Sequence, residues 1–150
     1  MSRAKTISAV LASATRKTAV ARCILTPGKG IIRINGRRIE FIENKYIRLL
    51  ILEPILLIGN LAQQINIRVR VRGGGIVSQA YAARCAIARA IVRYFQDPRI
   101  ERLYRWYDRY LLIEDTRQKE MKNSVDLEQE QDSKQATDSS KLTNFIKPEK

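Results

Sequence analysis

The chain has 150 residues, of which 45% are hydrophobic, so it is long enough for one globular domain and an extension. Its 28 Lys and Arg against 15 Asp and Glu give a formal net charge of +13, which favours a polyanionic partner. Two widely separated cysteines and no histidine leave no ligand set for zinc, and the longest apolar run is interrupted by Arg48, Glu53 and Pro54, which excludes a membrane span.

The first forty residues predict an arm, strands and turns. We expect residues 1–13 to form a flexible basic arm, and their lack of acids leaves an organellar transit segment open as an alternative. Apolar and polar residues roughly alternate from Lys17 to Leu25, which indicates a strand, and Ile31–Ile34 forms a second strand after a Pro-Gly turn. The pair Asn35-Gly36 predicts a hairpin, because both central residues of such a turn need a positive φ.

The middle of the chain predicts a helix and then the clearest strand. Apolar residues come at helical spacing from Glu43 to Leu52, and we expect Pro54 to break or kink this run. From Ile65 to Arg72 the sequence reads INIRVRVR, so its four apolar residues are expected to face a core. The opposite face of this strand carries Arg68, Arg70 and Arg72.

Residues Ile76–Phe95 predict one long helix. An arc of roughly 100°, the width of a core-facing stripe, contains Ile76, Ala80, Ala83, Ile87, Ala90, Ile91 and Tyr94. The opposite side, which we expect to face outward and to allow close approach of a ligand, carries Ser78, Ala82, Ala86, Arg89 and Arg93. Arg84 lies at the edge of the apolar arc, where it either extends toward solvent or pairs with an acid.

A second helix begins at Asp97-Pro98, with Asp as the N-cap and Pro as the first helical residue. Its apolar stripe consists of Ile100, Leu103, Tyr104, Tyr107 and Leu111, and its facing stripe consists of Arg99, Arg102, Arg105 and Arg109. Trp106 lies among these arginines. Stacking on a base is one interpretation of this residue, and packing against its own arginines or a neighbouring protein is the interpretation we prefer.

The charge divides the chain into a basic body and a mixed tail. Residues 1–117 hold 22 basic residues, 18 of them Arg, against 8 acids, whereas residues 118–150 hold six Lys and seven acids. An excess of Arg over Lys indicates bidentate contact with phosphate, the alternative being a merely basic surface. We assign residues 14–117 to one domain. The tail, residues 118–150, is expected to be disordered because it has few apolar residues.

Three glycines, Gly73, Gly74 and Gly75, join the arginine-bearing strand to the long helix. We interpret them as a site where main chain approaches a ligand without Cβ hindrance, next to a helix N-terminus that favours phosphate. Ser78 and Gln79 add polar donors in the first helical turn. The motifs G-x-x-x-x-G-K-[ST] and G-x-G-x-x-G are both absent, so a long polyanion is predicted rather than a single nucleotide.

Four collinear stretches share the pattern of a known family: RKTAVARCILTPGKGIIRINGRRIE, LLILEPILLIG, GGGIVSQAYAARCAIARAI and YDRYLLIEDTRQKEMK. Over about residues 14–122 they resemble the universal small-subunit ribosomal protein S-nine family. The second and fourth stretches are similar to the archaeal and eukaryotic branch of that family.

The resemblance implies an α+β domain with a four-stranded sheet and helices packed on one side, similar to the second domain of ribosomal protein S-five. It implies a structural, non-enzymatic protein of the small-subunit head in cytoplasmic ribosomes, bound to small-subunit ribosomal RNA and to neighbouring head proteins, with no cofactor, metal or membrane. In the family a basic tail reaches the peptidyl-tRNA site. Here the tail carries Asp126, Glu128, Glu130 and Asp132, which RNA would repel, so the tRNA contact is not carried over.

The residues predicted to contact RNA are Arg16, Lys17, Lys29, Arg37, Arg38, Arg68, Arg70, Arg72, Gly73, Gly74, Gly75, Ser78, Gln79, Arg84, Arg89, Arg93 and Arg117. A solvated charged face is the alternative for the exposed arginines, and an internal ion pair is the alternative for Arg84. The competing function is a free-standing RNA-binding protein outside the ribosome. Catalysis is not expected, because the paired carboxylates of the chain have neither a His partner nor a metal-binding motif beside them.

Overall fold

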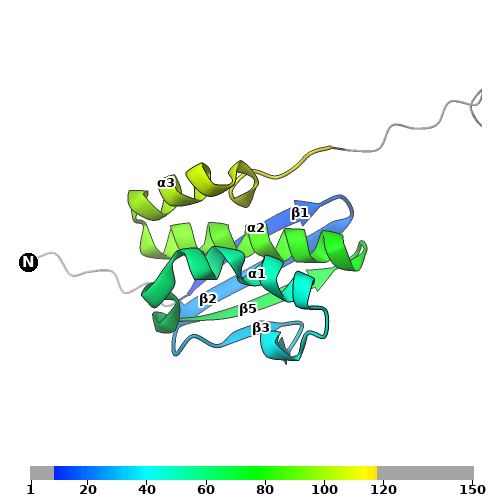
Figure 1. The fold of residues 1–150 in the computed structure, drawn as a ribbon, viewed down its shortest axis with the longest axis horizontal. Helices are drawn as coiled ribbons and strands as arrows, with labels where there is room; N and C mark the ends of the chain where they lie inside the picture. Colours follow the sequence, from blue (N-terminus) through cyan, green and yellow to red (C-terminus); the bar gives the residue numbers. More distant parts are fainter. Residues whose placement is uncertain (1–8, 118–150) are drawn as a thin grey trace, which may run out of the picture. The chain divides into compact units, whose positions relative to one another are not determined.

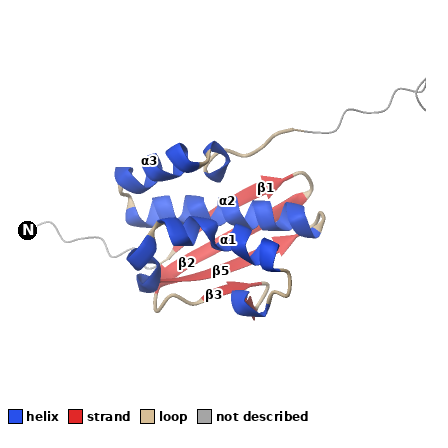
Figure 2. Cartoon of the chain, in the orientation of Figure 1, coloured by secondary structure: helices blue, strands red, loops and turns tan. Residues whose placement is uncertain are grey.

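The computed structural model describes residues 9–117; residues 1–8 and 118–150, which include the predicted tail and most of the predicted arm, lie outside the described part. The strands and main helices are β1 Val10–Arg16, β2 Ala19–Pro27, β3 Ile32–Ile34, β4 Arg37–Arg38, α1 Lys45–Leu57, β5 Ile65–Arg72, α2 Ile76–Phe95 and α3 Pro98–Tyr107. Short 3-10 helices, η1 Ile39–Phe41, η2 Gly59–Gln64 and η3 Arg109–Leu111, complete the described chain. One sheet lies against a single layer of helices (Figures 1 and 2).

The sheet has the strand order β1-β2-β5-β3-β4. Neighbouring strands are antiparallel except β3 and β5, which are parallel. The α+β class and the helices on one side are confirmed, although the described sheet has five strands instead of four. The strand that residue patterns missed is β1, which begins at Val10 inside the predicted arm. Its sequence VLASATR is a weak strand signal because Ala is depleted in strands.

The core lies between the sheet and α2. Alternate residues of β2 and β5 are buried: Ala19, Ala21, Cys23, Leu25, Ile65, Ile67, Val69 and Val71. The small side chains of β1 and β2 face the alanine-rich α2, so helix and sheet approach closely. Burial raises the pKa of the Cys23 thiol to about 12, which is the behaviour of an inert packed group.

Helix α2 is covered on more than its sheet-facing side, which contradicts the predicted outer face. Helices α1 and α3 and the η3 segment also pack against α2 (Figure 1). Ala82 and Ala86 are fully buried, and Arg89 and Arg93 on the same side of the helix donate to backbone carbonyl oxygens of β1, so this side faces the sheet edge. Ile76, predicted to lie in the core, is 71% exposed in the first turn. The prediction failed because a helix wheel shows one apolar arc and cannot show that the alanines of the other arc lie toward a strand.

Helix α1 continues through Pro54 to Leu57, so of the two outcomes expected at this proline a break is wrong, and a kink stays a prediction. The Asn44 side chain caps the start of α1 by accepting from the N–H groups of Tyr46 and Ile47. Near the other end, the buried Tyr104 of α3 donates its hydroxyl hydrogen to the Pro54 carbonyl oxygen at 2.6 Å. A carbonyl close to the helix terminus thereby obtains a buried partner, and α1 is tied to α3.

The start of α3 agrees with the prediction. The Asp97 side chain accepts a hydrogen bond from the Arg99 N–H at 2.8 Å, and Pro98 is the first helical residue. This N-cap satisfies one of the N–H groups that the helix itself leaves without a partner.

Candidate nucleic-acid interface

The face of the sheet away from the helices carries a cluster of arginines. We call Arg22, Arg33, Arg38, Arg68, Arg70 and Arg72 the arginine face; all six are exposed. The strand register places Arg22 directly opposite Arg70, and Arg33 between Arg68 and Arg38. Residues directly opposite one another share a face of the sheet, so four strands contribute to one positive surface.

Nothing in the described part of the chain neutralises this surface. Its ion pairs involve Arg16, Arg84, Arg89, Arg105 and Arg117, and no member of the arginine face. Like charges that face each other across strands destabilise a sheet. The arrangement therefore suits an anionic partner that lies along the sheet and separates the guanidinium groups.

Three open hollows lie between these arginines. One of about 490 Å³ is lined by Arg33, Arg68, Arg70 and Arg72 together with the Asn35-Gly36 turn. A second, about 440 Å³, is lined by Arg22, Arg70, Arg72 and the Thr18 side of the β1–β2 turn. A third, about 280 Å³, is lined by Arg33, Arg68 and Asn66. Such shallow basic hollows suit backbone phosphates, which accept hydrogen bonds from several arginines at once.

Two asparagines fix the loops at the ends of the arginine face. Asn35, at φ +49°, accepts from the Val71 N–H at 2.8 Å and donates to the Val71 carbonyl oxygen at 3.2 Å, so its side chain prolongs the pairing of β3 with β5. Asn66 accepts from the N–H groups of Lys29 and Ile31. These bonds hold the exposed turn residues Lys29, Arg37 and Arg38 against the central strand.

The three glycines have a structural cause that differs from the predicted one. A Cβ at Gly73 would lie 2.5 Å from the Thr18 carbonyl oxygen, and one at Gly74 would lie 2.9 Å from the Ala19 Cβ. Both glycines also have a positive φ, which side chains disfavour. The close approach is therefore to the β1–β2 turn of the same chain. Gly75 differs, because it is the N-cap of α2 and a Cβ there would meet nothing within 4 Å.

Of the two predicted donors, Gln79 already has an internal partner. Its Nε2 donates to the Gly73 carbonyl oxygen at 3.0 Å, which holds the glycine turn in place. Ser78 is half-buried. The part of this segment still open to an anion is the N-terminus of α2 at Gly75, where no side chain caps the helix.

We expect the three glycines to respond differently to substitution. Gly74→Ala should lower the free energy of unfolding by about 2 kcal/mol, since it adds both φ strain and a clash with Ala19. Gly75→Ala should change it by less than about 1 kcal/mol, because its φ is −88° and the space is open. Urea unfolding of both variants checks this, and equal losses would contradict the assigned cause.

Arg84 lies inside the domain. It is 5% exposed, its Nε is 2.6 Å from the Glu53 Oε2 of α1, and its Nη2 is 2.7 Å from the Asp108 Oδ2 after α3. The Nη2 contact is a hydrogen bond, whereas the Nε contact is ionic without hydrogen-bond alignment. The alternative of an internal ion pair therefore applies, and this side chain joins α2 to the elements on either side.

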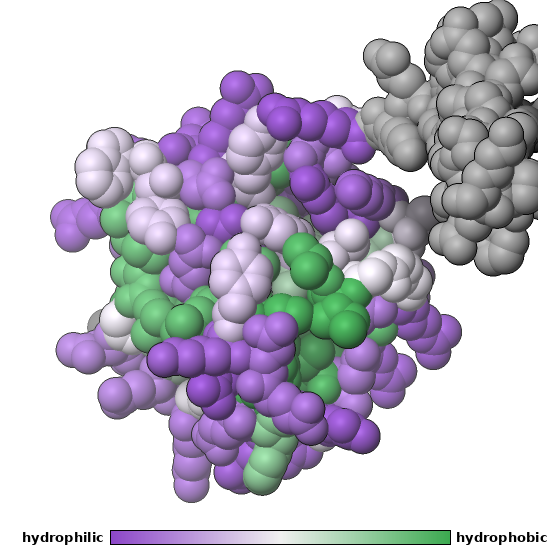
Figure 3. Space-filling view, turned by 45° about the vertical axis from the view of Figure 1, so that its right-hand side comes forward, coloured by the Kyte–Doolittle hydropathy of each residue, from purple (hydrophilic) through white to green (hydrophobic). Residues whose placement is uncertain are grey.

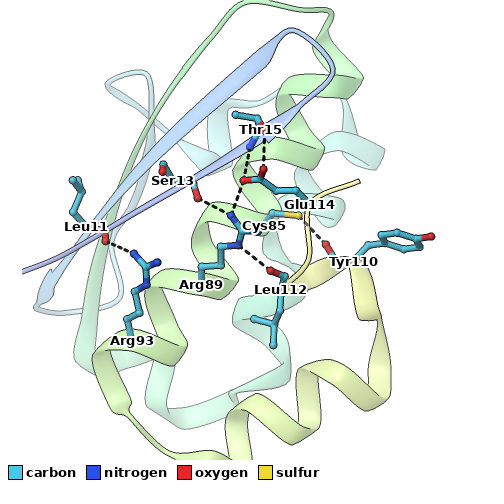
Figure 4. Close-up of polar contacts among 9 residues, drawn as sticks. All are labelled: Leu11, Ser13, Thr15, Cys85, Arg89, Arg93, Tyr110, Leu112 and Glu114. Carbon is cyan, nitrogen blue, oxygen red and sulfur yellow. Dashed lines mark hydrogen bonds and ion pairs between the residues drawn. The ribbon is translucent and has the colours of Figure 1, made fainter. Parts of the chain in front are cut away.

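Arg89 and Arg93 are engaged with the edge strand β1 (Figure 4). Arg93 donates to the Leu11 carbonyl oxygen at 3.1 Å, and Arg89 donates to the Ser13 carbonyl oxygen at 3.0 Å. An edge strand leaves such groups without a strand partner, and α2 supplies the partners here. Arg89 also donates from Nε to the Leu112 carbonyl oxygen at 2.9 Å, so both its Nε and its Nη1 are engaged within the domain.

Glu114 completes this edge contact (Figure 4). It accepts hydrogen bonds from the Thr15 N–H, the Thr15 hydroxyl and Arg89. In the same segment Asp115 pairs with Arg16, whose guanidinium also lies 5.4 Å from the centre of the Tyr81 ring. Arg16 is thus held by the fold, whereas Lys17 at the turn is exposed.

The pH dependence of stability should reveal the Glu114 contact. Burial alone raises the pKa of Glu114, but hydrogen bonds from Arg89 and Thr15 outweigh it and leave the pKa below the ordinary 4.5. A lowered folded pKa contributes stability above the unfolded pKa, and that stability is lost as the pH falls through the folded value. The difference in unfolding free energy between wild type and Glu114→Gln should therefore be constant from about pH 7 to 5 and shrink below about pH 4.5. Urea titrations across this range measure it, and a difference independent of pH would count against the contact.

The sequence reasoning missed Arg22 and Arg33. Both occupy outward positions on strands that the sequence predicted, so the alternation that placed Arg68, Arg70 and Arg72 would have found them. The fact that all five share one surface required the strand register. Arg117 is exposed and lies 6.0 Å from the Tyr110 ring centre. Within residues 9–117 no group of acids or cysteines is placed to hold a metal ion, and none of the described helices is long and apolar enough to cross a membrane.

A family model described as "Ribosomal protein S9/S16" matches residues 14–135. The chain belongs to this ribosomal protein family. The match confirms the resemblance and extends beyond residue 122, where the resemblance was expected to end. Membership in a family of ribosomal proteins also agrees with a non-enzymatic protein.

Archaeal members of the S9 family are similar over most of this chain. "Small ribosomal subunit protein uS9" of Desulfurococcus amylolyticus is 47% identical over 116 residues, covering 77% of this chain and 83% of the relative. The protein of the same name from Thermoplasma acidophilum is 46% identical, covering 72% and 84%. That of Saccharolobus solfataricus is 46% identical, covering 74% and 82%. The expected similarity to the archaeal branch of the family is therefore confirmed.

Proposed function

We propose that the protein is a structural constituent of the small ribosomal subunit and binds small-subunit ribosomal RNA through the arginine face. The observation that carries the proposal is the set of six exposed arginines on four strands, none of which takes part in an ion pair of the described chain. Family membership supports the ribosomal setting, because the related archaeal proteins are named as small-subunit proteins.

The proposed contacts differ from the sequence prediction in a way that the geometry explains. The arginine face, the turn residues Lys17, Lys29 and Arg37, and the open N-terminus of α2 form the proposed RNA surface. Arg84, Arg89 and Arg93 bond within the domain, so they are not part of it. Gly73 and Gly74 contribute the shape of the loop and no contact.

We further propose that the protein works in the head of the subunit, in cytoplasmic ribosomes, beside other head proteins. The tRNA contact of the family is not proposed for this chain, because the tail lies outside the described residues and carries seven acids. The phosphate contacts should read the backbone of folded RNA, since the hollows of the arginine face are lined mainly by positive charge and hydrogen-bond donors.

Sedimentation with ribosomal subunits tests the proposal. Tagged full-length protein and a version ending at Lys122 are expressed in cells and followed through gradients at rising salt. Purely electrostatic binding by 6–10 phosphate contacts loses roughly 10³–10⁵-fold in affinity between 50 and 200 mM salt. We expect the protein to remain in the small-subunit peak above that range. Protein at the top of the gradient at low salt would overturn the proposal and favour a free-standing RNA-binding protein.

A further inference from the structure

The outward face of α3 presents an open aromatic ring among positive charges. Trp106 is 85% exposed, more than any other large apolar residue of the described chain, and it is the single tryptophan of the sequence. Arg102 precedes it by four residues, which is the spacing of neighbours on one helical face, whereas Arg109 lies beyond the end of α3, in η3. Arg99 continues the same stripe toward the start of the helix.

Within the described residues the Trp106 ring is left largely uncovered. The cation–π contacts among residues 9–117 join Arg16 to Tyr81 and Arg117 to Tyr110, so no arginine of α3 stacks on Trp106. This removes one of the two arrangements that we preferred from the sequence, the packing of Trp106 against the arginines of its own helix. An indole that is exposed to water on its faces is available to a planar partner.

The charges beside the ring also lack partners within the described chain. Arg99, Arg102 and Arg109 take part in none of its ion pairs, whereas Arg105 pairs with Glu101 at 2.5 Å. The remaining acid of this helix start, Asp97, serves as the N-cap. In the view of Figure 3 hydrophilic side chains border the apolar areas of the surface. A protein partner would have to bring carboxylates, whereas a polynucleotide brings both charge and rings.

A hollow on another side of α3 carries further positive charge. It has a volume of about 730 Å³ and lies between α2, α3 and the η3 segment. Its walls include Arg89, Arg93, Arg105 and Arg109, with Glu101 as the one acid.

We propose that α3 is a second RNA-contact surface, which stacks an unpaired base on Trp106 and holds the adjoining phosphates with Arg99 and Arg102. Stacking on an aromatic ring requires a base that is not inside a duplex, so the ligand is a single-stranded loop, bulge or end. This surface belongs to the helical layer, and the arginine face lies on the opposite side of the sheet. The domain would then join two RNA segments, which goes beyond the proposed function.

Tryptophan emission tests this surface by itself, because Trp106 is the only indole in the chain. The full-length protein carrying Arg68→Gln and Arg70→Gln is titrated with an unstructured RNA of about 12 nucleotides, a length within the range of single-strand sites. We expect the emission to be quenched at saturation, and a duplex of the same length to quench it less. Unchanged emission, or equal quenching by the duplex, would overturn the proposal.

Substitution of the ring gives the second readout, the affinity for fluorescently labelled RNA in the same sheet variant. Trp106→Ala should weaken binding roughly 5- to 150-fold, the equivalent of about 1–3 kcal/mol per stacked base, and Trp106→Phe should recover most of the loss. Equal affinity of the Ala variant and its parent would contradict stacking. Since the ring is exposed, neither substitution should affect folding. This result does not depend on the RNA contact proposed for the arginine face. That contact is tested separately, in proteins that retain Arg68 and Arg70.

Discussion

Replacing Arg68 and Arg70 by glutamine should weaken binding to a small-subunit ribosomal RNA fragment by about 100-fold, taking about 1.5 kcal/mol for each charge-assisted hydrogen bond. The two side chains line the hollow of about 490 Å³ on the arginine face, and neither forms an ion pair within the described chain. The slope of log affinity against log salt should fall by about 2, since each lost phosphate contact removes about 0.9. Filter binding at several salt concentrations measures both effects.

A control variant with the same change in charge separates position from net charge. Lys45→Gln with Arg48→Gln removes two positive charges from α1, in the helical layer. We expect this variant to bind RNA almost as well as the wild type. An equal loss in both variants would mean that binding depends on overall charge, and the arginine face would then have no special part.

The variant with Arg68→Gln and Arg70→Gln should be at least as stable as the wild type when no RNA is bound. Arg70 lies directly opposite Arg22, and Arg68 directly opposite Arg33, so neutralising them removes repulsion between strands. Thermal unfolding without RNA tests this. A clear fall in melting temperature would indicate that these arginines also support the fold.

Arg84→Ala should give the largest loss of stability of any single substitution considered, about 3 kcal/mol. The reason is that Arg84 is buried between two carboxylates, Glu53 and Asp108, which lose their counter-charge together. This expected loss is at the low end of the range for breaking a buried ion pair, because both carboxylates are partly exposed. For a domain of this size the melting temperature should fall by roughly 12–24 °C.

Two further variants separate charge from packing at this position. Arg84→Met keeps an unbranched side chain of similar length, so it restores packing but not the ion pairs. Combining it with Glu53→Gln and Asp108→Asn removes the unpaired charges, and we expect this triple variant to recover much of the stability. If Arg84→Ala unfolds at the wild-type temperature, the contacts of Arg84 contribute nothing measurable.

The elements with a clear periodic pattern of apolar residues could be predicted to the residue. Strand β5 and helix α2 have the predicted bounds, because strict alternation and a long apolar arc leave little choice. Strand β1 was missed because alanines and hydroxyl residues give a weak alternation. The continuation of α1 past Pro54 depends on packing and a bond from Tyr104, which lies 50 residues away in sequence.

The candidate site was predictable in part. The outward direction of Arg68, Arg70 and Arg72 followed from alternation and is confirmed by their exposure. Arg89 and Arg93 bond the edge of a strand that the sequence did not reveal, so their contacts within the domain had no visible signal in the sequence. The glycines were correctly singled out, but their close neighbour is the chain's own turn, which only the pairing of β2 with β5 brings near.

The contact between Thr15 and Glu114 also bears on the order in which the domain forms during synthesis. The two residues are 99 positions apart, so β1 leaves the exit tunnel long before its edge can be covered. Arg89 and Arg93 of α2 can bond the Ser13 and Leu11 carbonyl oxygens of this edge earlier, but the Thr15 N–H has no partner until the segment with Glu114 emerges. A chain that stops short of Glu114 would leave that N–H of the edge strand unpaired, and unpaired groups on a strand edge are open to pairing with other chains.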